Sequence, residues 1–197
     1  MPELPEVEIV KRSLLKIANN AKIIDIKIKN KNLRYKIAKF FRKKLLNHKI
    51  LKISRRSKYI IFHFQNKLLL MHLGMTGKLL FFKNKNQEVF KTSFYYNLDI
   101  FPKHNHIFFT LNNNLTLIYN DVRRFGFFRI YENTKLDEIS FLNKLGIEPL
   151  NKKFNYNYFK KIIENKKKNI KNILMDQTLI CGLGNIYVNE ALFLAKI

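Results

Sequence analysis

Short segments of the kind that form β-strands dominate the chain between residues 22 and 131. They are rich in β-branched and aromatic residues, and polar turn sequences such as NKN, QNK and NNN separate many of them. The segments read IIDIKI, YIIFHF, LLLMHL, KLLFF, HIFFTL, LTLIY and FFRIY. Repeated short strands joined by turns are typical of antiparallel sheets, so this part of the chain predicts a β-sandwich or a β-barrel.

Helical periodicity precedes these segments. Between residues 3 and 17, apolar side chains recur at spacings of three and four, which predicts a helix with one buried face. Pro5 is compatible with that helix because it falls in the first turn, where the backbone N–H groups have no partner within the helix. A further amphipathic stretch near residues 36–46 indicates a second helix between strands.

The last third of the chain has a helical pattern. Apolar faces recur over residues 159–163 and 170–174, and a GLG turn then precedes a last helical stretch, NIYVNEALFLAKI. We therefore predict an α+β fold with two domains, residues 1–133 and 134–197.

The chain is strongly basic, with 38 Lys and Arg against 14 Asp and Glu and a formal net charge of +24. Such an excess favours a polyanionic partner, which means DNA or RNA in the first place. The alternative is compositional, because the chain is crowded with Lys, Asn and Ile, as an AT-rich genome would produce. An acidic membrane surface is the weaker competitor, since no amphipathic basic helix stands out.

Other sequence features concern membrane insertion, secretion and cysteine chemistry. The longest apolar runs, such as LLLM, are too short to span a bilayer, and the start lacks the apolar segment of a signal peptide. We therefore expect a cytoplasmic protein without a membrane partner. Cys181 is the only cysteine, which excludes an internal disulfide and a zinc site built from several cysteines.

Three of the 14 acidic residues lie within the first eight residues, MPELPEVE. Removal of Met1 would leave Pro2 with a free secondary amine, and an α-amino group is less protonated at neutral pH than a lysine side chain. Attack of that amine on a sugar aldehyde carbon gives a cationic iminium, which acts as an electron sink. Glu3 is a candidate general acid beside the amine, and Glu6 lies one turn on. The alternative is an ordinary helix start, where acids complement the helix dipole.

Several motifs, in order along the chain, resemble those of formamidopyrimidine-DNA glycosylases. They are MPELPEVE at the start, RRSKY at 55–59, HLGMTG at 72–77, DVRRFG at 121–126, LGIEPL at 145–150, and LMDQ with GLGNIY between 174 and 187. The related endonuclease VIII-type enzymes share the proline start but usually read PEGPE. Leu4 therefore favours the branch that acts on purine lesions.

The resemblance implies a DNA repair enzyme with two activities. Members of the family excise oxidised purines such as 8-oxoguanine and formamidopyrimidines, and they then cut the abasic strand by lyase chemistry. The implied fold is an N-terminal helix with an antiparallel β-sandwich, followed by a helix–two-turn–helix domain and a zinc ribbon. The implied partner is damaged double-stranded DNA, bound by a monomer at the bacterial nucleoid.

By the same resemblance, Pro2 is the nucleophile that attacks the sugar C1′ and forms the Schiff base. Glu3 is the proton donor for base loss and ring opening, and Glu6 joins the candidates because it lies one turn on and faces the same way. Lys58 in RRSKY matches the lysine credited with proton transfer in β-elimination and with a phosphate contact. Seen alone, Lys58 would be a solvated lysine at a strand end.

A base inside a duplex must be flipped out before it can be cut, and the hole that it leaves must be filled. Met75, Arg123 and Phe125 match the family's inserting residues. Met fills irregular space, Phe wedges between stacked bases, and Arg can hydrogen-bond the orphaned cytosine. Seen alone, the Met and the Phe would be assigned to the core. The residues expected to bind the DNA backbone are His72, His104, Lys166, Lys171 and Asn185.

The sequence also departs from the family. The family continues for several tens of residues past Ile197, with a loop that closes over the flipped base and a four-cysteine zinc ribbon whose arginine is tied to δ-elimination. We therefore expect a C-terminally truncated member without zinc, in which δ-elimination is doubtful. Asn105 stands in KHNHI where the family often has Asp. The alternative function is a catalytically impaired DNA-binding remnant of the same family.

Overall fold

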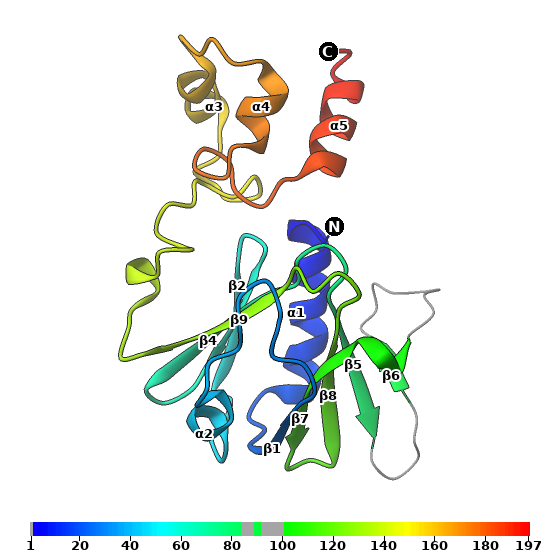
Figure 1. The fold of residues 1–197 in the computed structure, drawn as a ribbon. Coiled ribbons are helices and arrows are strands. Elements are labelled where there is room, and N and C mark those ends of the chain that lie inside the picture. The colour runs from blue at the N-terminus through cyan, green and yellow to red at the C-terminus, as the bar shows by residue number, and fades with distance from the viewer. Residues whose placement is uncertain (1, 84–88, 92–100) are drawn as a thin grey trace. The chain divides into compact units, whose positions relative to one another are not determined.

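The computed structural model describes residues 2–83, 89–91 and 101–197. The chain divides into two compact units, Met1–Thr134 and Lys135–Ile197 (Figure 1). The first unit contains two β-sheets and the second unit is helical, which confirms the predicted α+β class. The predicted domain bounds, 1–133 and 134–197, stay a prediction.

Two antiparallel sheets form the body of the first unit (Figure 1). Their strand orders are β1-β7-β8-β5-β6 and β2-β3-β4-β9. The strands are β1 Ile23–Ile28, β2 Lys52–Arg56, β3 Tyr59–His63, β4 Lys67–His72, β5 Lys78–Lys83, β6 Val89–Lys91, β7 Asn105–Leu111, β8 Leu115–Asn120 and β9 Phe127–Glu132. Every segment predicted to be a strand forms one. Apolar residues of both sheets share one core, so of the two predicted architectures the sandwich is confirmed.

The predicted N-terminal helix is confirmed as α1, Leu4–Ala18. Its buried face includes Val7, Val10 and Leu14, which pack into the core that the two sheets share. Fully burying an aliphatic side chain of this size contributes about 1.5–3 kcal/mol to folding. The apolar stripe of α1 therefore holds the start of the chain firmly against the sandwich.

The predicted helix near residues 36–46 is wrong in length. Only α2, Phe41–Leu45, is helical. The backbone N–H of Ile37 donates to the carbonyl of Lys31 at 2.9 Å, so the chain forms a turn before the helix begins. Ile37 and Phe41 are four residues apart and both are buried. This is the apolar spacing of a helix, although the backbone around Ile37 is not helical.

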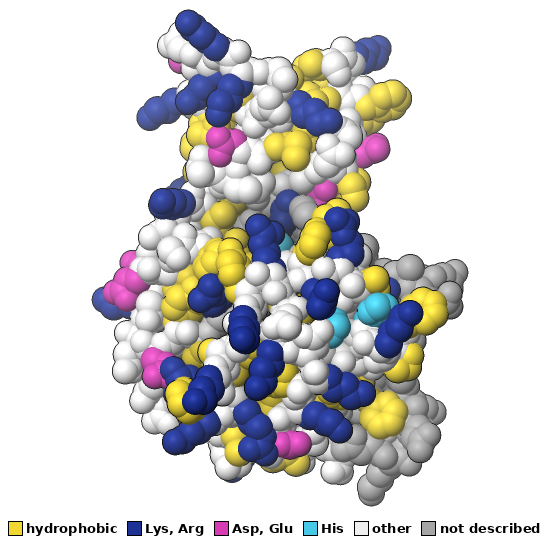
Figure 2. All heavy atoms as spheres, viewed as in Figure 1, with side chains coloured by type: hydrophobic (Ala, Val, Ile, Leu, Met, Phe, Trp, Pro, Cys, Tyr) yellow, Lys and Arg dark blue, Asp and Glu magenta, His cyan; other side chains and the backbone are white. Residues whose placement is uncertain are grey.

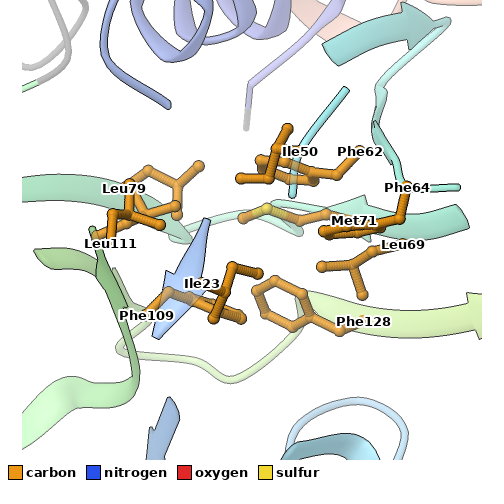
Figure 3. Close-up of a pocket in the computed structure, with 11 residues that line it drawn as sticks. Ile23, Ile50, Phe62, Phe64, Leu69, Met71, Leu79, Phe109, Leu111 and Phe128 are labelled. Carbon is orange, nitrogen blue, oxygen red and sulfur yellow. The ribbon is translucent and has the colours of Figure 1, made fainter. Parts of the chain in front are cut away.

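Aromatic rings pack closely in the core of the sandwich. The rings of Phe41, Phe109 and Phe128 pack with centroids 6.0–6.2 Å apart, and Tyr119 meets Phe128 edge-on at 4.9 Å. A small cavity lies among these residues, and its lining consists of aliphatic and aromatic residues and one methionine (Figure 3). Such a lining offers no polar group to a substrate, so this cavity is a packing feature and not a reaction site.

The second unit contains the predicted helices. They are α3 Tyr156–Ile163, α4 Ile170–Met175 and α5 Asn185–Leu194. The side chains of Asn155 and Asn169 cap α3 and α4 by accepting backbone N–H groups at 3.0 and 2.9 Å. Ile162, Leu174 and Val188 belong to a small core shared by the three helices. Across the described ranges, no helix is both long enough and apolar enough to cross a bilayer.

Candidate functional site

The register of the four-stranded sheet brings two predicted site residues to one of its ends. The turn Ser57–Lys58 joins β2 to β3, because Arg56 pairs with Tyr59. Tyr59 also pairs with His72 on β4, and His72 pairs in turn with Phe127 on β9. Lys58 and His72 therefore lie at the same end of the sheet. The ring of His72 stacks on Phe127 with centroids 5.6 Å apart.

The start of α1 is buried. Pro2 is buried and Glu3 is only 1% exposed. Glu3 is the N-cap of α1, and its backbone N–H donates to Oε2 of Glu6 at 2.8 Å in a capping box. Glu6 thus has a structural task at the helix start, while Glu3 directly follows the candidate nucleophile. Met1 lies outside the described residues.

An ion pair connects α1 with the turn that carries Lys58. Nε of Arg55 donates to Oε2 of Glu8 at 2.9 Å, and Nη1 of Arg55 donates to the carbonyl of Ser57 at 2.9 Å. Ser57 has a φ of +54°, a left-handed backbone that is uncommon outside glycine. One guanidinium therefore fixes both the first turns of α1 and the turn that presents Lys58.

Lys58 affects the protonation of His72 electrostatically. Lys58 is buried, with 7% exposed. Burial, and then the positive charges of Lys58 and Arg34, lower the pKa of His72 from 6.5 to about 4. His72 is therefore neutral at pH 7. Its Nδ1 accepts the backbone N–H of Gly74 at 3.0 Å, so Nε2 carries the proton and is the ring's one donor.

The three predicted inserting residues lie on two loops that touch. Met75 and Phe125 are each 41% exposed, so neither belongs to the core. The guanidinium of Arg123 lies over the ring of Phe125, 4.4 Å from its centroid, in a cation–π contact. Gly74 has a φ of +65°, and a Cβ there would lie 2.5 Å from the backbone nitrogen of Gly126. The two loops therefore meet through main-chain atoms.

A basic cleft of about 540 Å³ opens beside these loops. The backbone N–H of Arg34 donates to the carbonyl of Gly126 at 3.3 Å, which places the two walls side by side. Figure 2 shows that Lys and Arg side chains spread widely over the visible face of the first unit. Three arginines in one cleft suit a polyanion. The cleft is lined by Asn32, Leu33, Arg34, Arg123, Arg124 and Phe125.

His104 ends a short 3-10 helix, Pro102–His104, and is half-buried. Its carbonyl accepts the backbone N–H of Asp121 at 3.0 Å, so it adjoins the loop of Arg123. Oδ1 of the neighbouring Asn105 accepts Nδ2 of Asn120 at 2.7 Å. An aspartate could accept the same hydrogen bond, so the change from Asp to Asn keeps this local contact.

The other predicted backbone-binding residues belong to the second unit. Lys166 is exposed in the connection between α3 and α4, and Lys171 is half-buried on α4. Asn185 is exposed and is the first residue of α5, which confirms that a helix begins there. Free N–H groups in a first helical turn can bind a phosphate.

Gln177 is a residue of the second unit whose role the sequence did not reveal. Its Nε2 donates to the carbonyl of Leu183 at 2.8 Å, and its Oε1 accepts the backbone N–H of Gly182 at 2.9 Å. Gly182 has a φ of +98°, so the turn suits glycine. Gln177 therefore shapes the GLG turn that leads into α5.

Three residues of the first unit were also missed, namely Asp121, Thr76 and Tyr119. Asp121 opens the DVRRFG motif, but an acid directly after a strand is also a common turn residue. The structure shows instead that it is fully buried between the two loops of the inserting residues. The sequence offered one clue. Asp121 stands in DVRRFG and Thr76 stands in HLGMTG, and both motifs carry inserting residues.

Metal binding has no support among the described residues. No group of three or more His, Cys, Asp and Glu in the described ranges could hold a metal ion. Cys181 is a buried free cysteine, so this part of the chain does not fit a zinc ribbon. The expected absence of a cofactor stays a prediction.

Two family models match the chain. Residues 1–128 match the formamidopyrimidine-DNA glycosylase N-terminal domain, and residues 145–197 match the formamidopyrimidine-DNA glycosylase H2TH domain. A formamidopyrimidine-DNA glycosylase of Bartonella tribocorum is 41% identical over 202 residues, covering 100% of this chain and 68% of the relative. One of Rickettsia bellii is 42% identical over 198 residues, covering 100% and 67%.

Solved structures give the same result. A complex of wild-type Lactococcus lactis Fpg with DNA containing N7-benzyl-Fapy-dG has a TM-score of 0.84 and 35% identity, covering 100% of this chain and 68% of that one. A complex of the Lactococcus lactis Fpg with DNA containing an abasic site has a TM-score of 0.82 and 34% identity, covering 99% and 67%. The chain thus matches about two thirds of the length of these proteins.

Proposed function

Because the chain belongs to the formamidopyrimidine-DNA glycosylase family, we propose that it removes oxidised purines from double-stranded DNA and then cuts the abasic strand. The observation that carries the proposal is the buried start of α1, where Pro2 and Glu3 precede a helix that Arg55 joins to the turn of Lys58. Two similar structures support the substrate class, since they hold DNA with N7-benzyl-Fapy-dG or with an abasic site.

The proposed reaction begins at the secondary amine of Pro2, which removal of Met1 would free. The nitrogen lone pair attacks C1′ of the damaged nucleotide, and the N–C1′ bond forms as the glycosidic bond breaks. The base leaves after taking a proton, which Glu3 supplies. The nitrogen then loses its proton, the C1′–O4′ bond breaks, O4′ takes a proton, and the freed nitrogen lone pair completes a cationic iminium.

Strand cutting follows from the iminium. Loss of a proton from C2′ sends its electron pair toward the cationic nitrogen, and the 3′ phosphate then leaves in a β-elimination. We assign this proton transfer to the buried Lys58, whose unprotonated amine accepts the proton from C2′ and becomes an ammonium group. Hydrolysis of the remaining imine releases Pro2. No second elimination is proposed.

The proposed DNA contacts divide between the two units. In the first unit Met75, Arg123 and Phe125 fill the hole left by the flipped nucleotide, and neutral His72 donates from Nε2 to a phosphate oxygen. In the second unit, the same role of phosphate binding falls to Lys166, Lys171 and the first turn of α5. The net charge of +24 supports strong, salt-dependent binding to the duplex. We propose that one copy of the chain binds each lesion.

Borohydride trapping separates the steps of this proposal. The unchanged chain should form a covalent adduct with duplex DNA that contains 8-oxoguanine and with duplex DNA that contains an abasic site. Glu3→Gln should lose most of the adduct with the 8-oxoguanine duplex and keep more of the adduct with abasic DNA, because the base is already gone there. Glu6→Gln is the matched control, since glutamine can still accept the N–H of Glu3. Salt-sensitive duplex binding without any adduct would instead indicate a DNA-binding remnant.

A further inference from the structure

Asp121 is a charged residue at the centre of the first unit's candidate DNA-binding loops, and it is 0% exposed. Burying a carboxylate is costly unless hydrogen bonds satisfy its oxygens. We infer that Asp121, acting through Thr76, is a positioning residue that holds the loop of Met75 and the loop of Arg123 and Phe125 in the relative placement needed to fill the hole in the duplex. This inference rests on the proposed function.

The carboxylate joins the two loops with three hydrogen bonds. Oδ1 accepts the hydroxyl of Thr76, on the loop that follows β4. Oδ2 accepts the hydroxyl of Tyr119 at 2.8 Å and the backbone N–H of Gly126 at 2.9 Å. Thr76 directly follows Met75, and Gly126 directly follows Phe125. Two of the three bonds therefore act on a residue adjacent in the chain to an inserting side chain, and the third ties the carboxylate to Tyr119 on β8.

Thr76 extends the connection to Arg123. Its Oγ1 donates to Asp121 and also accepts the backbone N–H of Arg123 at 3.0 Å. A threonine hydroxyl has one proton, so donation to Asp121 orients a lone pair toward the other loop. The hydrogen bond to the Asp121 carboxylate thereby fixes the polarity of the bond that holds Arg123. A valine at position 76 would keep the shape of the side chain and lose both bonds.

The main chain of Asp121 is held as well. Its backbone N–H donates to the carbonyl of His104 at 3.0 Å, and its own carbonyl lies 2.7 Å from Nε2 of His106. Both backbone groups of Asp121 therefore have partners around the start of β7. The carboxylate is thus anchored to the sheet, and the two loops are anchored to the carboxylate.

The surrounding backbone shows why such anchoring is useful. Arg124, between Arg123 and Phe125, has a φ of +58°, a left-handed conformation that costs a non-glycine residue free energy. Met75 and Phe125 are each 41% exposed, so packing against the first unit holds their side chains only in part. Side chains placed in advance lose less conformational entropy on inserting into DNA than side chains on loose loops. The hydrogen bonds of Asp121 supply that placement.

The test compares Thr76→Val with Thr76→Ser on two forms of abasic DNA. An abasic site opposite cytosine in a duplex presents a hole and an orphaned base, whereas single-stranded abasic DNA presents neither. Borohydride trapping reports the amine chemistry on both. We expect Thr76→Val to lower the trapping rate on the duplex about tenfold or more, since it removes both hydrogen bonds of the Thr76 hydroxyl. Thr76→Ser, which keeps the hydroxyl, should stay within about twofold of the unchanged chain.

On single-stranded abasic DNA, both variants should trap at the rate of the unchanged chain. Asp121→Asn is a second variant with the same expected selective loss, and thermal melting verifies that each variant is folded. Equal losses by Thr76→Val on both DNAs, or no loss on the duplex, would overturn the inference. Absence of any adduct from the unchanged chain would instead overturn the proposed function, so the two failures are distinct.

Discussion

Replacement of Glu8 by glutamine is expected to destabilise the first unit in a strongly pH-dependent way. Glu8 accepts hydrogen bonds or ion pairs from Lys11, Arg12 and Arg55, and its side chain is 22% exposed. Burial alone would raise the pKa of Glu8, but the hydrogen bonds from Lys11, Arg55 and Arg12 together outweigh it. The pKa of Glu8 falls from 4.5 to about 2 as a result.

The magnitude follows from the linkage between protonation and folding. A lowering of the pKa from 4.5 to about 2 corresponds to about 3.4 kcal/mol at neutral pH, as an upper limit. The contribution is fully present above the unfolded pKa of 4.5 and is lost as the pH falls through about 2. By the same relation about 1.4 kcal/mol is left at pH 3. Glutamine keeps one acceptor, so we expect Glu8→Gln to cost about 1–3 kcal/mol at pH 7.

Urea unfolding of the unchanged chain and of Glu8→Gln, followed by circular dichroism between pH 7 and pH 2, measures this difference. Arg12→Ala is the matched control, because Arg12 contacts the same carboxylate but is 73% exposed. Such an exposed helix pair should contribute less than about 0.5 kcal/mol. A loss for Glu8→Gln that is as large at pH 2 as at pH 7 would refute the electrostatic reasoning. So would an equal loss for Arg12→Ala.

Three further predictions concern the end of the sheet where His72 lies. The NMR titration midpoint of His72 should lie near pH 4, and the stability tied to its neutral form should fall as the pH drops from 6.5 to about 4, because only the unfolded chain takes up the proton there. Lys58→Gln should raise the midpoint of His72 but leave it below 6.5, because burial is the largest cause of the lowered pKa. An unchanged midpoint would contradict this. Gly126→Ala should cost about 1–3 kcal/mol or more in urea unfolding, because a Cβ there would lie 1.8 Å from the hydroxyl oxygen of Tyr119 and 2.7 Å from the carbonyl oxygen of His72. Tyr119→Phe in that background should recover only part of the loss, and a neutral Gly126→Ala would contradict the packing.

The elements with regular apolar patterns were the predictable ones. α1 and the strands from β3 to β5 carry their burial pattern in consecutive residues, so local sequence was enough to place them. β2 reads KISRR, and its charged residues hide the alternation that marks a strand. It is a strand because it pairs with β3, and this pairing depends on tertiary structure that the local sequence does not show.

The site divides in the same way. Pro2, Glu3 and Lys58 could be proposed as site residues from sequence because they stand in specific motifs. The contact between Glu8 and Arg55 joins residues 47 positions apart, and no local pattern predicts such a pair. The same holds for the hydrogen bond between Thr76 and Asp121, which lie 45 positions apart. These long-range hydrogen bonds decide how the motif residues are held, and only the fold reveals them.

Borohydride trapping on abasic duplex DNA, followed by mass spectrometry of the digested adduct, tests the central claim most directly. We predict that the sugar is attached to the N-terminal peptide that begins with Pro2, and that a chain retaining Met1 gives little or no adduct. An adduct on a peptide that contains Lys58, or an equal yield from the chain that retains Met1, would contradict the assignment of Pro2 as the nucleophile.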